Sequence, residues 1–180
     1  MLKIDDARCV HRLAARASCA ACVRACPQGA WRSDVESLAF DAARCDGCGL
    51  CLGACPTGAL ALPDTGAGAE PLRQRLPDGG QAIALACARA PGIGAKGAAD
   101  DPNVLPCVHA VDEDRLLRWQ AAGVTRIALL TGDCPSCPRG RRLDAAQTLP
   151  GRLALLSALV PARSALPTVE RLAAWAAAPA

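Results

Sequence analysis

Residues 45–56 read Cys-Asp-Gly-Cys-Gly-Leu-Cys-Leu-Gly-Ala-Cys-Pro, and this stretch decides the fold of the first third of the chain. Its first three cysteines are Cys45, Cys48 and Cys51. Their spacing lets one tight turn direct three thiolates to three corners of a single cubic metal cluster. Gly47 and Gly49 let that turn bend and let backbone N–H groups face the sulfurs. We expect Cys55 at the start of the next helix, where it would face the other way, toward a different cluster.

A related stretch lies upstream, so the motif is part of an internal repeat. Residues 40–45 echo residues 4–9, and residues 53–60 echo residues 24–31. The cysteines of the first copy are Cys9, Cys19, Cys22 and Cys26. Between its first two cysteines this copy is seven residues longer than the second copy, and we expect an extra helical turn or loop there. Repetition of a short unit indicates two similar modules that pack on each other.

The pattern Cys-x2-Cys-x2-Cys-x3-Cys-Pro resembles that of the two-cluster bacterial ferredoxins, over about a third of the chain. The resemblance implies two [4Fe–4S] clusters with crossed ligation. The first cluster would be bound by Cys9, Cys19, Cys22 and Cys55. The second would be bound by Cys45, Cys48, Cys51 and Cys26. A three-iron first cluster, a different fourth ligand in place of Cys9, and zinc at the Cys-x2-Cys pairs are the alternatives. Trp31 occupies the place of Leu60 in the repeat, and both are expected to pack over the clusters.

Four further cysteines lie in the rest of the chain: Cys87, Cys107, Cys134 and Cys137. They follow three apolar, strand-like runs at residues 81–86, 103–106 and 124–130. Because the carboxyl ends of parallel strands meet at one edge of a sheet, we expect these four thiols to converge. Four cysteines suit a [2Fe–2S] cluster. The alternatives are structural zinc, a thiol/disulfide pair at Cys134 and Cys137 before a helix, or four free thiols, with His109 less favoured as a ligand.

This region also resembles a known family, through residues 105–112, 116–117, 121–124 and 129–134. These stretches are similar to the delta iron–sulfur subunit of methyl-viologen-reducing hydrogenases and to related heterodisulfide reductase partners, over residues 81–140. The resemblance implies one [2Fe–2S] cluster held by four cysteines, and a relay of electrons between larger subunits. The short Cys134-x2-Cys137 spacing and the long gap after Cys87 depart from that family's pattern.

The expected fold has two domains. Residues 1–62 form an α+β ferredoxin-like dicluster domain of two β-hairpin-and-helix repeats, and residues 63–80, rich in Gly and Pro, form a linker. Residues 81–180 form a small three-layer α/β domain with a parallel sheet. Its expected elements are strands at 81–86, 103–106, 124–130 and 152–156, and helices at 112–122, 139–149 and 168–177.

The composition and the first residues indicate in which compartment of the cell we expect the protein. Twelve of 180 residues are Cys, and the first eight residues contain two acids and no secretory apolar segment. A cytoplasmic protein with metal-bound thiols follows, and no apolar run is long enough for membrane insertion. Four aromatic residues allow only a modest core, so metal ligation should stabilise the first domain. The formal charge of +3 counts thiols as neutral, and the scattered arginines form no stripe suited to nucleic acid.

The sequence therefore predicts an iron–sulfur electron-transfer protein rather than an enzyme acting on its own. Its partner would be a larger redox enzyme or subunit, such as a hydrogenase or dehydrogenase. The alternatives are an iron–sulfur sensor that regulates a partner and a thiol oxidoreductase at Cys134 and Cys137. Residues 92–97 match G-x-G-x-x-G, but we expect no strand to end there and no helix to follow, so this match does not predict nucleotide binding.

Overall fold

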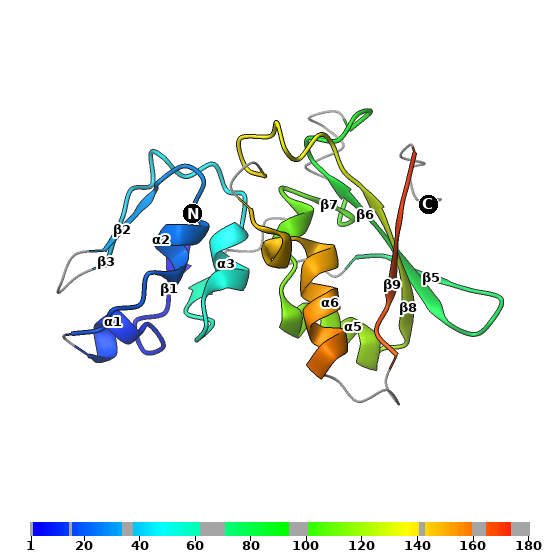
Figure 1. Cartoon of the computed structure of the whole chain (residues 1–180), viewed down its shortest axis with the longest axis horizontal. Coiled ribbons are helices and arrows are strands. Elements are labelled where there is room, and N and C mark those ends of the chain that lie inside the picture. Colours follow the sequence, from blue (N-terminus) through cyan, green and yellow to red (C-terminus); the bar gives the residue numbers. More distant parts are fainter. Residues whose placement is uncertain are drawn as a thin grey trace.

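The computed structural model describes residues 2–14, 16–33, 38–61, 71–93, 101–140, 143–159 and 165–173. Residues 2–61 and residues 71–173 form two parts that lie side by side (Figure 1). The elements of the first part are β1 (Lys3–Ile4), α1 (Val10–Leu13), α2 (Ala21–Ala25), β2 (Trp31–Ser33), β3 (Leu38–Phe40), α3 (Leu50–Ala54) and β4 (Leu60–Ala61). Within the described ranges, no helix has the length and apolar character needed to span a membrane.

The two repeats of the first part share their strands. Strand β1 pairs antiparallel with β4, and β2 pairs antiparallel with β3, so each small sheet takes one strand from each repeat. The expectation of one β-hairpin within each repeat is therefore wrong. The cysteine turn and its helix separate the two strands of a repeat, and each strand finds its partner in the other copy. Trp31 and Leu60 are both buried in the small core between the repeats, as the repeat predicted.

The second part is built on a mixed sheet. Its elements are β5 (Arg73–Arg75), β6 (Gln81–Cys87), β7 (Val104–Leu105), the 3-10 turn η1 (Val108–Ala110), α5 (Glu113–Ala121), β8 (Val124–Leu130), the 3-10 turn η2 (Ala145–Gln147), α6 (Leu149–Leu159) and β9 (Thr168–Arg171). Strands β6, β8 and β9 are parallel neighbours in that order. One edge of β6 is shared by β5, which is antiparallel to it, and by β7, which is parallel. The predicted strands at 81–86, 103–106 and 124–130 are confirmed as β6, β7 and β8.

Helices α5 and α6 lie on the side of the sheet that faces residues 2–61 (Figure 1). The strand order accounts for this arrangement. The chain moves in one direction from β6 to β8 to β9, and right-handed crossovers in one direction place their helices on one face. In the described residues the second part therefore shows two layers, and the third layer of the expected architecture is not among them.

The expected helix at 139–149 and strand at 152–156 are also wrong. The chain turns through residues 137–140, with the Gly140 N–H donating to the Cys137 carbonyl oxygen (3.0 Å), and the helix that follows is α6. Helix α6 buries Leu149, Arg152, Leu153 and Leu156, which is a helical stripe. A short apolar run such as 152–156 cannot be assigned to strand or helix by periodicity alone. Pro150 is tolerated because it lies in the first turn of α6.

Two further expectations need correction. Residues 168–171 were expected to begin a helix, but they form β9, where Val169 pairs with Ile127 of β8. The remainder of that expected helix, from residue 174, lies outside the described residues. Residues 73–75 were expected in the linker, but they form β5, where Arg73 pairs with Ile83 of β6. The predicted helix at 112–122 is confirmed as α5, with the Asp112 carboxylate accepting the Arg115 N–H (2.8 Å) at its start.

Candidate metal centres

One cavity of the first part is lined by four cysteines from both repeats. These are Cys9, Cys19, Cys22 and Cys55. The other residues that line the cavity are mostly apolar, including Leu38 and Leu60. The four cysteines are the set that the ferredoxin resemblance assigned to the first cluster. Several thiols in an apolar pocket are the donor set and surroundings that suit an iron–sulfur cluster.

The long first loop still brings Cys9 to this cavity. Residues 10–13 of the insertion form α1, and Cys9 itself is buried at its start. The His11 ring donates from Nε2 to the carbonyl oxygen of Cys19 (2.6 Å), so α1 is tied to the next cysteine of the motif. The extra helical turn expected in this insertion is confirmed.

Three cysteines of the second expected set, Cys26, Cys45 and Cys51, are neighbours, whereas Cys48 packs with Leu50 and Cys107. Burial, and then the neighbouring thiols of Cys26 and Cys45, raise the pKa of Cys51 to about 11. The structure thus brings Cys26, from the first repeat, close to two cysteines of the second. Cys22 of the other set is also a neighbour of Cys51, so the two sets lie side by side. Single electrons could therefore pass between clusters bound at these two sets.

The turn around Cys48 has the backbone that its glycines allow. Gly47 and Gly49 have φ values of +70° and +79°, a region that residues with a Cβ rarely adopt. The bend expected at these two positions is confirmed. The thiol of Cys48 is buried, which raises its pKa to about 12, while the backbone N–H of Leu50 acts in the opposite sense.

Cys26 and Cys55, which end the two motifs, have matching surroundings. Cys55 lies at the carboxyl end of α3, so its expected place at the start of a helix is wrong. The Ala30 N–H donates to Cys26 Sγ and the Ala59 N–H donates to Cys55 Sγ, both at 3.3 Å. At Cys55, burial raises the pKa, but hydrogen bonds from Thr57, Ala59 and Leu60 outweigh it, and the net pKa is lowered. This site is organised for a thiolate, which is the form that binds iron.

Three cysteines of the second part lie close together near the carboxyl ends of its strands. Burial raises the pKa of Cys107 to about 12, and the nearby thiols of Cys87 and Cys134 act in the same direction. Burial also raises the pKa of Cys134, followed by the effects of Cys87 and Cys137. Each of the four cysteines is thus a neighbour of at least one other. Cys134 and Cys137 lie in a loop of turns rather than before a helix, because the expected helix at 139–149 is absent.

His109 has a defined orientation beside this group. The backbone N–H of Leu149 donates to its Nδ1 (3.2 Å), so the neutral ring carries its proton on Nε2. That nitrogen lies 3.5 Å from Cys134 Sγ, which makes the ring a hydrogen-bond donor to the sulfur. Burial, and then the charges of Arg152 and Arg171, lower the pKa of His109, so the ring is neutral at pH 7. Sequence reasoning considered His109 only as a ligand and missed this role.

Among the described residues, no three His, Cys, Asp or Glu side chains are placed to hold one metal ion. A cluster of several irons is wider than a single ion and needs ligands that lie further apart. Residues 17–59 match the 4Fe-4S dicluster domain family. This part of the chain is therefore a ferredoxin-type segment, and it gives the protein an iron–sulfur electron-transfer role. Seven of the eight cysteines expected as ligands lie inside the matched residues, and Cys9 precedes them. No curated protein and no solved structure matches the chain.

Proposed function

We propose that the protein carries electrons between two [4Fe–4S] clusters in residues 2–61 and a third cysteine-bound centre in residues 71–173. The first cluster would be held by Cys9, Cys19, Cys22 and Cys55. The second would be held by Cys45, Cys48, Cys51 and Cys26. When bound, these clusters accept and release single electrons without any bond to substrate being made or broken.

The observation that carries this proposal is the cavity lined by Cys9, Cys19, Cys22 and Cys55. These residues are up to 46 positions apart in the sequence and come from both repeats, yet they line one apolar pocket. The two sets of thiols lie side by side, since Cys22 neighbours Cys51. Short spacing between redox centres favours conduction of electrons through the protein.

The third centre is proposed at Cys87, Cys107, Cys134 and Cys137. A [2Fe–2S] cluster is proposed because four cysteines are its complement of ligands, and structural zinc is the alternative. A thiol oxidoreductase at Cys134 and Cys137 is disfavoured, because burial raises the pKa of Cys134 and the expected helix at 139–149, whose start would have lowered it, is not formed by the described residues of that range. We further propose a larger redox enzyme or subunit, in the cytoplasm, as the partner.

Metal analysis of the full-length protein, purified without oxygen, tests this proposal. We expect about ten irons and ten sulfides per chain, about eight from the first part and about two from the second. Zinc without additional sulfide would replace the [2Fe–2S] assignment with a structural site. An iron content well below about eight would contradict the two-cluster assignment.

The crossed assignment has its own test in Cys26→Ser. Cluster-specific EPR should show the change at the cluster that Cys45, Cys48 and Cys51 hold. The matched variant Cys55→Ser should instead disturb the cluster held by Cys19 and Cys22. If each variant disturbed only the cluster of its own repeat, the crossed assignment would be wrong.

A further inference from the structure

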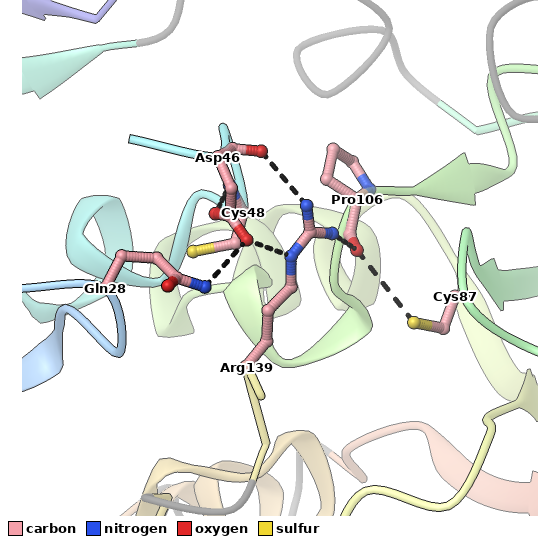
Figure 2. A network of polar contacts seen from close by, with 6 residues as sticks. All are labelled: Gln28, Asp46, Cys48, Cys87, Pro106 and Arg139. Carbon is pink, nitrogen blue, oxygen red and sulfur yellow. Dashed lines mark hydrogen bonds and ion pairs between the residues drawn. The ribbon is translucent and has the colours of Figure 1, made fainter. Parts of the chain in front are cut away.

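One arginine of the second part reaches into the first part (Figure 2). Arg139 donates from Nε to the Asp46 carboxylate (2.7 Å) and from Nη2 to the Asp46 carbonyl oxygen (3.0 Å). Its Nη1 donates to the carbonyl oxygen of Pro106 (2.6 Å). The side chain is only 11% exposed, so the ion pair is largely shielded from water. The planar guanidinium serves three acceptors at fixed angles, which a lysine ammonium cannot reproduce.

Each acceptor belongs to a loop that carries proposed ligands. Asp46 lies between Cys45 and Cys48, and its carboxylate also accepts the Cys48 N–H (3.2 Å). Gln28 of the first repeat donates to the same carboxylate (3.2 Å). The Asp46 side chain therefore fixes the turn that presents Cys48.

The other acceptor, Pro106, directly precedes Cys107. The Pro106 carbonyl oxygen also lies 3.9 Å from Cys87 Sγ. Pro106 is therefore close to two proposed ligands, Cys107 and Cys87. Arg139 itself follows Cys137 by two residues. One guanidinium thus joins the Cys48 loop of the first part to three cysteine-bearing segments of the second.

Behind this contact the two parts share a small buried core. Cys48, Leu50 and Cys107 form one apolar cluster, with exposed fractions of 8%, 2% and 4%. Leu143 packs against it. Cys48 and Cys107, which belong to different parts of the chain, therefore lie in the same dry contact.

We propose that Arg139 is a positioning residue that fixes the Cys48 loop against the Cys107 loop, and that this junction is where one electron passes between the second cluster and the second-domain centre. The inference rests on the proposed centre at Cys87, Cys107, Cys134 and Cys137. In the transfer one centre is oxidised by one electron and the other is reduced, and no bond or proton moves. Cys22 neighbours Cys51, so a cluster held by Cys9, Cys19, Cys22 and Cys55 would exchange electrons with the second.

The test uses the full-length, anaerobically purified protein and the variants Arg139→Gln and Arg139→Lys. In the reduced wild type, EPR should show a magnetic interaction between the second cluster and the second-domain centre. Arg139→Gln should weaken that interaction while leaving metal and sulfide content unchanged. Hydrogen exchange of the peptides around Cys48 and Cys107 should speed up about 10- to 100-fold, as expected for the loss of a charge-assisted contact. Arg139→Lys should show both effects to a smaller degree.

The matched control is Arg118→Gln. It removes a guanidinium that lines a cavity together with Cys48 and Cys107 but whose ion-pair partner is Asp114, on the same helix. Both measurements should match the wild type in this variant. If Arg139→Gln fails to accumulate, Asp46→Asn removes the opposite charge of the same ion pair. Asp46→Asn should also weaken the magnetic interaction between the second cluster and the second-domain centre.

The outcomes separate this inference from the proposed function. A wild type without a third centre would overturn both. A wild type that has the third centre but shows no magnetic interaction with the second cluster would overturn this inference alone. An unchanged magnetic interaction together with unchanged hydrogen exchange in the Arg139 and Asp46 variants would also overturn this inference alone.

Discussion

At the scale of single residues, the surroundings shift the pKa values of different cysteines in opposite directions. Hydrogen bonds from Thr57, Ala59 and Leu60 lower the pKa of Cys55 in spite of burial. Burial raises the pKa of Cys48 and of Cys107 to about 12. Metal coordination would make the buried thiolates favourable, so cluster assembly at the proposed sites would be linked to proton release.

These shifts predict the order in which thiols of the metal-free protein react with iodoacetamide. The reactive form is the thiolate, so Cys55 should be alkylated first at neutral pH, and at a lower pH than an ordinary thiol. Cys48 and Cys107 should react appreciably only as the pH rises well above 9 toward 12. Mass spectrometry of timed samples gives the rates. Thr57→Val should slow the reaction of Cys55, and equal rates for all three cysteines would contradict the assignment.

His109 gives a second prediction at this scale. Its Nε2–H donates to Cys134 Sγ, and such bonds stabilise the more negative, reduced state of a cluster. His109→Phe should lower the reduction potential of the second-domain centre by about 40 mV, if about 1 kcal/mol of differential stabilisation is lost. His109→Gln keeps a donor and should restore part of the shift. Redox titration followed by EPR gives the potential, and a Phe variant with the wild-type value would exclude this role.

At the scale of elements, α6 shows how local chemistry places a helix that periodicity did not reveal. The Thr148 hydroxyl accepts the Gly151 N–H (3.2 Å) at the start of α6 and donates to the Ala145 carbonyl oxygen (2.7 Å). A Cβ at Gly151 would overlap the Ala145 carbonyl group, so only glycine allows η2 to turn directly into α6. The helix packs Leu149, Leu153 and Leu156 into the core of the second part.

Thr148→Ala should therefore lower the free energy of unfolding by about 1 kcal/mol, the usual cost of losing a helix cap. Thr148→Ser keeps the hydroxyl and should stay close to the wild type. Urea denaturation followed by Trp fluorescence measures the difference, since Trp119 is buried beside this core. If the Ala and Ser variants were equally stable, the hydroxyl would not be acting as a cap.

What the sequence could predict at this scale followed from strong local signals. Strands β6 and β8 are long apolar runs, and α5 has an acidic first turn, a capping Asp112 and Gly123 at its end, with φ of +88°. The end of the chain lacked such signals. The apolar run 152–156 fits either structure, and β9 is a strand because it pairs with β8, whose partner residues are 42 positions away.

The cysteines themselves could be chosen from spacing, because a cluster imposes its own geometry on nearby ligands. The residues that support them could not. Arg139 and Asp46 are 93 positions apart, and the contact between His109 and Leu149 spans 40. No local pattern marks either pair. The nearest signal was the position of Arg139, two residues after a Cys-x2-Cys pair.

At the scale of the whole molecule, the second folded part already includes residues 71–75, which lie inside the linker expected at 63–80. Strand β5 covers one half of the edge of β6, and the Asn103 side chain bonds both the N–H and the carbonyl of Leu72 (2.9 and 3.3 Å). Residues 71–75 are thus part of the second fold. Removing them would expose one edge of β6 and leave buried Asn103 with fewer partners.

A fragment of residues 71–180 should consequently be more stable than one of residues 78–180. The difference in unfolding free energy should be about 1–3 kcal/mol, the cost of leaving buried polar groups unsatisfied. Urea denaturation of the two fragments under the same reducing conditions makes the comparison. Asn103→Ala in the longer fragment should remove part of its advantage. Equal midpoints for the two fragments would place residues 71–75 outside the folded unit.

The pairing of β1 with β4 also affects how the protein is made. Cys9 is translated early, but the cavity that it lines is completed by Cys55 and Leu60, and β1 finds its partner only at residues 60–61. A ribosome that has delivered the first repeat alone has therefore exposed cysteines that cannot yet close around iron. Cluster insertion must wait for the second repeat to emerge, and until then the nascent thiols depend on a reducing environment or on a carrier for protection.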